Sequence, residues 1–276
     1  SFDPETIRRL AALTIKSGNK IRARKISVPA VPLPRTDRGN FGQLVAEGVL
    51  LGNYSFDQYK SENRDEKTVS EVEILEEAKS HPSLQAGIAK GRSIASATNF
   101  ARDLVNSPAS DMTPARMVAE ARKIGRLPGV SVRVLDRKEC ERLGMGGFLA
   151  VAKGSMEPPY LIHFKYRPSG RSKGRIAIVG KGITFDSGGL SLKTAQGMET
   201  MKDDMSGAAA VLALMKVFSE LRPKVEVHGI TAVTENMPSG SADKPGDGVK
   251  TLTGKTIEIL NTDAEGRLTL ADAVPY

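Results

Sequence analysis

Residues 175–189, RIAIVGKGITFDSGG, place a lysine and an aspartate directly after an apolar run. The run at 175–179 is typical of a buried strand, and the glycines that follow it predict a sharp turn that presents Lys181 and Asp186. Open α/β sheets place their sites at such strand ends. A phosphate-binding P-loop is excluded because Gly182, and not Ser or Thr, follows the lysine. We therefore expect a site built on a lysine and a carboxylate.

Strand and helix patterns alternate on both sides of this stretch. Apolar strand patterns cover residues 130–135, 160–166 and 225–233, and helical patterns cover 114–124 and 207–221. Such alternation predicts an α/β domain with a largely central sheet.

The first hundred residues have a different pattern. Asp3-Pro4 reads as a helix cap with a first-turn proline, and the helix that follows would carry Ile7, Leu10, Ala11 and Ile15 on one face. Further segments follow in chain order: an edge strand or loop at 25–33, a helix at 41–51, a charged turn at 61–67, a strand at 69–75 and a long helix at 83–105. We place a domain boundary on that long helix.

Composition restricts the class of protein. With 39% hydrophobic and 26% charged residues, the chain of 276 residues reads as globular. A single cysteine, Cys140, excludes an intrachain disulfide and a cysteine-rich zinc site, and it predicts a reducing, cytoplasmic location. Cys140 itself is expected to be a small packing residue. No apolar run approaches the roughly 18 residues of a membrane span, so a membrane partner is not expected.

The net charge of +8 raises the question of a nucleic-acid partner. Residues 1–40 hold nine Lys or Arg against three Asp or Glu, which accounts for most of the excess. This segment has no interleaved aromatic residues and no recognised nucleic-acid motif. A solvated basic face is therefore the favoured interpretation, and nucleic acid is not an expected partner.

Two further segments carry carboxylates. Asp203 and Asp204 precede the helix at 207–221, where acids also occur simply because they complement the helix dipole. In residues 261–268, NTDAEGRL, an extended backbone would project Asp263, Glu265 and Arg267 to one side. That stretch is either a solvated edge or, because an apolar run precedes it, part of a sheet interior. Buried carboxylates need a counter-charge, which metal ions supply.

The histidines do not suggest another catalytic scheme. Only His81, His163 and His228 are present, and none lies in a His-Glu-x-x-His motif, which excludes a histidine-rich zinc site. His163 and His228 lie within strand patterns and are expected to be packed or edge residues.

Taken together, the strings at 178–189, 201–210 and 261–268 resemble the catalytic motifs of the leucyl aminopeptidase family, also called cytosol aminopeptidases. The octapeptide at 261–268 is close to diagnostic. Segments at 97–114, 146–159 and 235–247 also resemble the family, so the resemblance covers residues 40–276.

The resemblance implies a two-domain α/β fold. We expect a small, partial N-terminal α/β domain at 1–82, a linker helix at 83–106 and a larger α/β/α metallopeptidase catalytic domain with a central mixed sheet at 107–276. This domain is expected to be truncated and its sheet incomplete at the C-terminus, and residues 1–276 expressed alone are expected to be poorly soluble and inactive. Pro275 is expected to stop or kink the helix that follows Arg267.

The resemblance also implies a site with two divalent metal ions, zinc or manganese, with magnesium as a third candidate. One ion would be bound by Lys181, Asp186, Asp204 and Glu265, and the other by Asp186, Asp263 and Glu265. Asp186 and Glu265 would then bridge the ions, and Lys181 would ligate as a neutral amine.

By the same resemblance, the protein would be a hydrolase that removes N-terminal amino acids, leucine-type residues preferred, from peptides. A hydroxide that bridges the two metals would attack the scissile carbonyl. Lys193 would stabilise the oxyanion, Arg267 would hold a bicarbonate ion that shuttles the proton, and Met201 would line the pocket for the first side chain. The family also implies a homohexamer.

Two alternatives remain open. The chain could be a non-catalytic family member that acts as a nucleic-acid-binding or structural protein through its basic N-terminal half. The presence of Lys181, Lys193 and Arg267 together with all four carboxylates argues against that alternative. A two-metal phosphoesterase would share the same ligand chemistry and differ in its substrates.

Overall fold

The computed structural model describes residues 3–30, 37–62 and 67–276. It contains two compact units, Ser1–Phe100 and Ala101–Tyr276. Helix α3 (His81–Asn106) runs from the first unit into the second. The segments expected at 25–33 and 61–67 lie partly outside the described residues. The division into 1–82, 83–106 and 107–276 stays a prediction.

The first unit begins with helix α1 (Pro4–Lys20), which starts where the sequence predicts. The Asp3 carboxylate caps it by accepting a hydrogen bond from the Thr6 amide at 2.7 Å. The helix buries Ile7, Ala11 and Ile15, whereas Leu10 of the same apolar face is 48% exposed. The buried residues repeat mainly at intervals of four, and Leu10 lies about 100° around the helix from the centre of their stripe.

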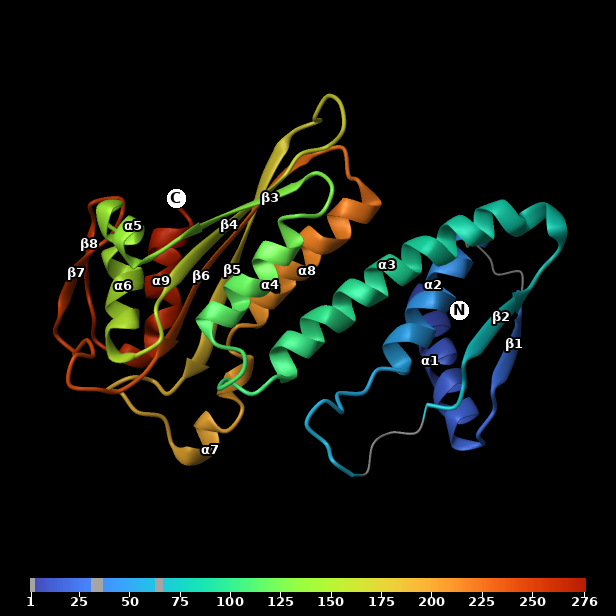
Figure 1. Ribbon diagram of the computed structural model, residues 1–276, viewed down its shortest axis with the longest axis horizontal. Coiled ribbons are helices and arrows are strands. Elements are labelled where there is room, and N and C mark those ends of the chain that lie inside the picture. The colour runs from blue at the N-terminus through green and yellow to red at the C-terminus, as the bar shows by residue number, and fades with distance from the viewer. Residues whose placement is uncertain (1–2, 31–36, 63–66) are drawn as a thin grey trace. The chain divides into compact units, whose positions relative to one another are not determined.

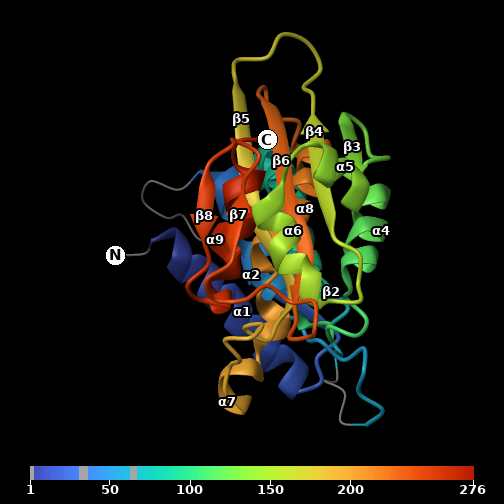
Figure 2. The same ribbon diagram turned by 90° about the vertical axis from the view of Figure 1, so that its left-hand side faces the viewer.

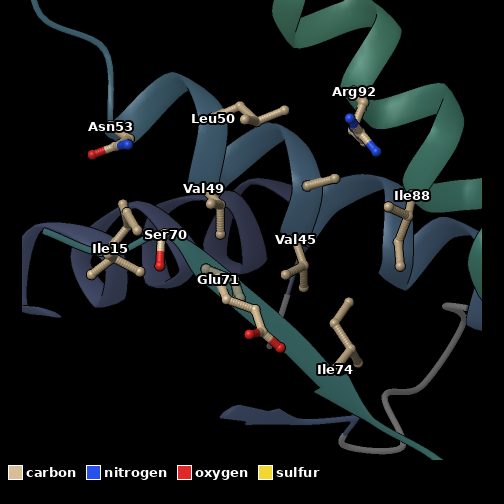
Figure 3. Close-up of a pocket in the computed structure, with 13 residues that line it drawn as sticks. Ile15, Val45, Val49, Leu50, Asn53, Ser70, Glu71, Ile74, Ile88 and Arg92 are labelled. Atoms are coloured by element: carbon tan, nitrogen blue, oxygen red, sulfur yellow. The ribbon is translucent and has the colours of Figure 1, made fainter. Parts of the chain in front are cut away.

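A parallel strand pair completes this unit. Strand β1 (Lys25–Pro29) pairs with β2 (Glu71–Leu75), and helix α2 (Arg38–Gly52) lies between them in the chain. The core consists of Ile7, Ala11, Phe41, Leu44, Val45 and Leu84. A pocket of about 440 Å³ is lined mostly by apolar residues of α1, α2, β2 and α3, with Glu71 and Arg92 as its charged members (Figure 3).

The second unit is built on a four-stranded mixed sheet, as the sequence predicts (Figure 1). Its order is β3 (Val130–Leu135), β4 (Tyr160–Tyr166), β6 (Glu226–Asn236) and β5 (Arg175–Asp186). The β3–β4 and β4–β6 pairs are antiparallel, and β5 runs parallel to β6. β5 and β6 therefore end at the same edge of the sheet.

Helices cover both faces of this sheet, which gives three layers (Figure 2). Helices α4 (Pro114–Ile124) and α8 (Ser206–Leu221) pack on one face. Helices α5 (Arg137–Arg142), α6 (Gly146–Val151) and α9 (Glu265–Ala273) pack on the other, where Cys140 is fully buried as predicted. Smaller elements are α7 (Ala195–Met198) and the hairpin of β7 (Gly248–Lys250) with β8 (Thr256–Glu258).

Strand β5 differs from its sequence prediction in two ways. It begins exposed, because it lies at an edge of the described sheet, and it continues through Lys181 to Asp186 without a turn. Gly180 serves close packing, since a Cβ there would lie 2.4 Å from the Gly207 carbonyl oxygen of α8. The sharp turn comes later, at Gly188 and Gly189, whose φ values are +86° and +65°.

Residues 262–268 are helical and only Asn261 is extended, so the extended form predicted for 261–268 is wrong. The Asn261 side chain accepts a hydrogen bond from the Asp263 amide at 2.8 Å and caps the 3₁₀ helix Thr262–Ala264. Helix α9 follows at once, so local capping overrides the alternating pattern. α9 ends at Ala273, which confirms the predicted stop before Pro275.

Among the described residues, no helix is both long and apolar enough to cross a membrane.

Candidate metal centre

Five polar side chains from three segments of the chain meet at the carboxyl end of β5. Lys181 and Asp186 lie on β5 itself, and Asp204 lies just before α8. Asp263 lies in the 3₁₀ helix before α9, and Glu265 is the first residue of α9. Carboxylate oxygens of Asp186, Asp263 and Glu265 lie within 4.8 Å of one another.

The first of two lysines in the site pairs with two of the carboxylates. The Lys181 amine lies 2.7 Å from Asp204 Oδ1 and 2.6 Å from Glu265 Oε1. Burial raises the pKa of Asp204 to about 6, although Lys181 opposes the shift. Burial lowers the pKa of Lys181, but hydrogen bonds with Asp204 and Glu265 outweigh it and raise that pKa above its ordinary value. Lys181 must therefore lose a proton before it can ligate a metal.

The second lysine pairs with the other two carboxylates. The Lys193 amine lies 3.1 Å from Asp186 Oδ2 and 2.5 Å from Asp263 Oδ1. Burial lowers the pKa of Lys193, but its hydrogen bonds with Asp263 and Asp186 outweigh burial and raise it. When the two lysines and the four carboxylates are all ionised, the cluster keeps an excess of negative charge.

Because part of the cluster is buried, its excess of negative charge is poorly compensated by solvent. Asp186 and Glu265 are each only 2% exposed. Asp204 Oδ2 and Glu265 Oε2 are buried and have no hydrogen-bond partner in the described part of the chain. A buried acceptor without a partner costs about 1–3 kcal/mol, and more when it is charged. Divalent cations would supply the missing charge, and carboxylates with one amine are suitable ligands for such ions.

Asp203 and Asp204 differ in their surroundings. Asp203 is exposed, whereas the Asp204 side chain is 18% exposed and paired with Lys181. Helix α8 has no side-chain cap hydrogen bond, so Asp204 does not act as an ordinary capping acid. These surroundings favour a role in the cluster over a role at the helix end.

Two other predicted site residues come from the same segments. Arg267 lies in the first turn of α9 and is exposed, and its guanidinium makes no hydrogen bond or ion pair with the residues that the structure describes. Met201 begins the 3₁₀ helix Met201–Asp203, which precedes Asp204, and it is half-buried.

Sequence reasoning missed two residues of the site. Asn236, the last residue of β6, is 1% exposed and donates a hydrogen bond to Asp186 Oδ1 at 2.8 Å. Gly266 faces Lys181, because a Cβ there would lie 2.9 Å from Cδ and 3.1 Å from Nζ of that lysine. A polar residue at the end of an apolar strand was the available signal for Asn236. The sequence gives no such signal for Gly266, because its contact with Lys181 depends on how the backbone folds.

Residues 170–174 have the spacing of another catalytic motif, but their structure differs from the one that this motif requires. Residues 170–174, GRSKG, have the Gly-x-Ser-x-Gly spacing of a nucleophile elbow. Ser172 lies in an exposed loop between two strands, whereas such an elbow joins a strand to a helix. Its hydroxyl donates to the Gly174 carbonyl at 2.6 Å, so it holds the loop together.

Comparison with known proteins finds one family along the chain. A model of the catalytic domain of the cytosol aminopeptidase family matches residues 99–276, and a model of the N-terminal domain of that family matches residues 1–63. A probable cytosol aminopeptidase of Persephonella marina is 44% identical over 276 residues, and one of Aquifex aeolicus is 44% identical over 277 residues. Each match covers 99% of this chain, and 55% and 54% of those proteins. The chain thus spans about half the length of the relatives it matches.

Solved structures give the same result. A mutant of tomato leucine aminopeptidase matches with a TM-score of 0.88 and 38% identity, over 99% of this chain and 53% of that one. The bottromycin maturation enzyme BotP in complex with Mn matches with a TM-score of 0.88 and 36% identity, over 99% of this chain and 56% of that one.

Proposed function

This chain belongs to the cytosol aminopeptidase family, and on that premise we propose that the protein is a metal-dependent aminopeptidase. It would release N-terminal amino acids, leucine-type residues preferred, from peptides. The observation that carries the proposal is the partly buried cluster at the end of β5, in which four carboxylates face two lysines and two carboxylate oxygens lack a partner among the described residues.

The residues present fit a pair of divalent ions. Lys181, Asp186, Asp204 and Glu265 would hold one ion, and Asp186, Asp263 and Glu265 the other, so that two carboxylates are shared. Manganese is the first candidate because the related BotP structure is a complex with Mn, and zinc and magnesium are the other candidates. Bound there, such ions would polarise the scissile carbonyl and lower the pKa of a water molecule.

Lys193 has a position suited to stabilising developing charge. Its ammonium group lies between Asp186 and Asp263, and these two carboxylates raise its pKa even though burial lowers it. The group would therefore stay charged at neutral pH. We assign it to the oxygen of the scissile carbonyl, where negative charge develops during hydrolysis.

Arg267 would take part in proton transfer, and Met201 would take part in substrate binding. Arg267 has no partner among the described residues, and its exposed guanidinium would hold a bicarbonate ion that takes and returns a proton. Met201 would contact the first side chain of the peptide, for which its flexible apolar side chain is suited.

The test is a peptidase assay on a protein of the relatives' full length (the full-length protein), because the chain spans about half the length of the relatives it matches. We expect it to cleave leucyl-p-nitroanilide with added Mn²⁺, to lose this activity in EDTA, and to leave N-acetyl-leucyl-p-nitroanilide intact. Cleavage of the acetylated substrate at an equal rate would exclude an aminopeptidase. If the protein cleaves p-nitrophenyl phosphate and neither leucyl substrate, the phosphoesterase alternative would replace the aminopeptidase proposal.

Membership of the family also leads to a proposal for assembly and location. We propose a homohexamer in the cytoplasm, with peptides as the substrate partners. Light scattering on the full-length protein measures the state of assembly, and a monomeric mass would contradict the hexamer.

A further inference from the structure

Asn236 occupies a buried position between two segments of the metal centre. One N–H of its side-chain amide donates to Asp186 Oδ1 at 2.8 Å, and the same nitrogen donates to the Thr262 carbonyl oxygen at 3.0 Å. A carboxylate and a carbonyl are acceptors only, so the amide nitrogen, and not the amide oxygen, must face them. With 1% of its surface exposed, Asn236 cannot exchange these partners for bulk water.

The first bond orients the Asp186 carboxylate. Asp186 Oδ1 accepts from Asn236 and also from the Gly188 amide at 2.8 Å. These two donors hold Oδ1 on the protein side of the site. Oδ2 is then the oxygen that faces the lysine-carboxylate cluster, where it lies 3.1 Å from the Lys193 amine.

The second bond fixes the segment that carries Asp263. Thr262, the residue before Asp263, is 1% exposed. Its hydroxyl donates to the Gly188 carbonyl at 2.6 Å and accepts from the Ser191 amide at 2.8 Å. Through its side chain, Asn236 therefore joins the end of β5 to the turn before α9.

The backbone of Asn236 adds a third connection. Its carbonyl oxygen accepts from both the amide and the hydroxyl of Ser187, at 2.9 Å and 2.7 Å. Ser187 directly follows Asp186, so the residue that orients the carboxylate also holds the backbone beside it. The end of β6 thus fixes the metal centre through both its side chain and its main chain.

We propose that Asn236 is a positioning residue of the metal centre, which holds Asp186 and the Thr262–Asp263 turn in the arrangement that binds divalent ions. The inference rests on the proposed metal-dependent function. A side-chain amide, with two donors on one nitrogen, satisfies both acceptors. Aspartate would set a third acceptor and a like charge against Asp186, and leucine would leave both acceptors buried without this donor.

Metal affinity of the full-length protein is the decisive measurement. Mn²⁺ binding is titrated by calorimetry after removal of metal, and the unfolding temperature is measured in EDTA. In Asn236→Leu we expect the Mn²⁺ dissociation constant to rise by about 10–100-fold, the loss typical for residues that orient metal ligands. Asn236→Ser is the second variant if the leucine variant does not fold. It should also raise the dissociation constant, because one hydroxyl can donate to only one of the two acceptors.

Thr231→Val is the matched control. Thr231 lies on the same strand, is fully buried, and its hydroxyl has no hydrogen-bond partner among the described residues. The Mn²⁺ dissociation constant of this variant should equal that of the parent.

The outcomes are distinguishable. An Asn236→Leu or Asn236→Ser protein with a lower unfolding temperature but the dissociation constant of the parent would assign Asn236 to the fold alone and overturn the proposal. The same rise in Thr231→Val would also overturn it, because the effect would then be general to the strand. A parent that binds no divalent ion would refute the metal centre itself, and this role with it.

Discussion

The parallel strands β5 and β6 carry carboxylates at both ends, and the two ends differ in how those charges are balanced. At the amino end, one Glu226 oxygen accepts from Arg175 Nε at 2.6 Å, contacts His228 Nε2 at 3.0 Å and lies 3.3 Å from the Lys165 amine. At the carboxyl end, four carboxylates share two lysines, and two of their oxygens have no partner in the described part of the chain.

One carboxyl group at each end has a shifted pKa, and the two shifts have opposite directions. The hydrogen bond with His228, followed by those with Lys165 and Arg175, outweighs burial and lowers the pKa of Glu226 to about 2. Burial raises that of Asp204 to about 6. The amino end is thus neutralised by the protein's own side chains, whereas the carboxyl end lacks positive charge. This difference indicates which end is built to receive cations.

The largest expected effect comes from removing the carboxylate that the two proposed ions share at the end of β5. Asp186→Ala should lose bound metal and reduce kcat by more than about 10³-fold, because electrostatic stabilisation and the activation of water both depend on the ions. Metal analysis and a leucyl-p-nitroanilide assay measure the two effects. Full metal loading in this variant would rule out the shared position of Asp186.

Removing the two cationic side chains should separate chemistry from metal binding. Lys193→Ala and Arg267→Ala should each reduce kcat by about 10²–10³-fold, the usual effect of one preorganised charged group, with metal content nearly unchanged. Lys165→Ala, at the amino end, is the matched control and should leave kcat unchanged. Equal losses in Lys193→Ala and Lys165→Ala would show that the two ends do not differ in function.

A smaller effect is expected from crowding the proposed lysine ligand. In Gly266→Ala the new methyl group would meet the Cδ and Cε atoms of Lys181 at 2.9 Å and 3.0 Å, so the lysine must move. Overpacking of this kind typically costs about 1–3 kcal/mol. We expect a lower unfolding temperature and weaker Mn²⁺ binding by calorimetry. Unchanged metal affinity would contradict the expected dependence of metal binding on the Gly266–Lys181 contact.

The smallest effect concerns the amino end and depends on pH. The pKa of Glu226 is lowered from 4.5 to about 2 in the folded protein, so its contribution to stability is present above pH 4.5 and is lost as pH falls toward 2. Glu226→Gln should lack this part of the acid dependence and keep full peptidase activity. Thermal unfolding between pH 7 and pH 2 measures it, and parallel profiles for parent and variant would contradict the expected pairing.

Much of the fold could be predicted because its signals are local. The strands expected at 130–135 and 160–166 match β3 and β4, and Thr113 caps α4 where Thr-Pro predicts a helix start. These features depend on hydrophobic periodicity and on caps within a few residues. The mixed sheet followed from the family resemblance.

The site was harder because its contacts join distant segments. The alternation of Asp263, Glu265 and Arg267 predicts one shared side, but the helical backbone buries Glu265 within the carboxylate cluster and leaves Arg267 exposed. The assignment of each lysine to two carboxylates, and the contacts of Asn236, depend on β5, β6 and α9 meeting in space. The spacing of residues within one segment cannot predict contacts between β5, β6 and α9.

The contact of Gly266 with Lys181 has a consequence at the level of the gene. Every single-nucleotide change of a glycine codon that alters the amino acid and keeps the reading frame open introduces a residue with a Cβ atom. At this position each such residue would meet the lysine side chain. Every amino-acid change that one nucleotide can make at Gly266 would therefore require the Lys181 side chain to move, whereas a change at the third base of the glycine codon keeps the glycine.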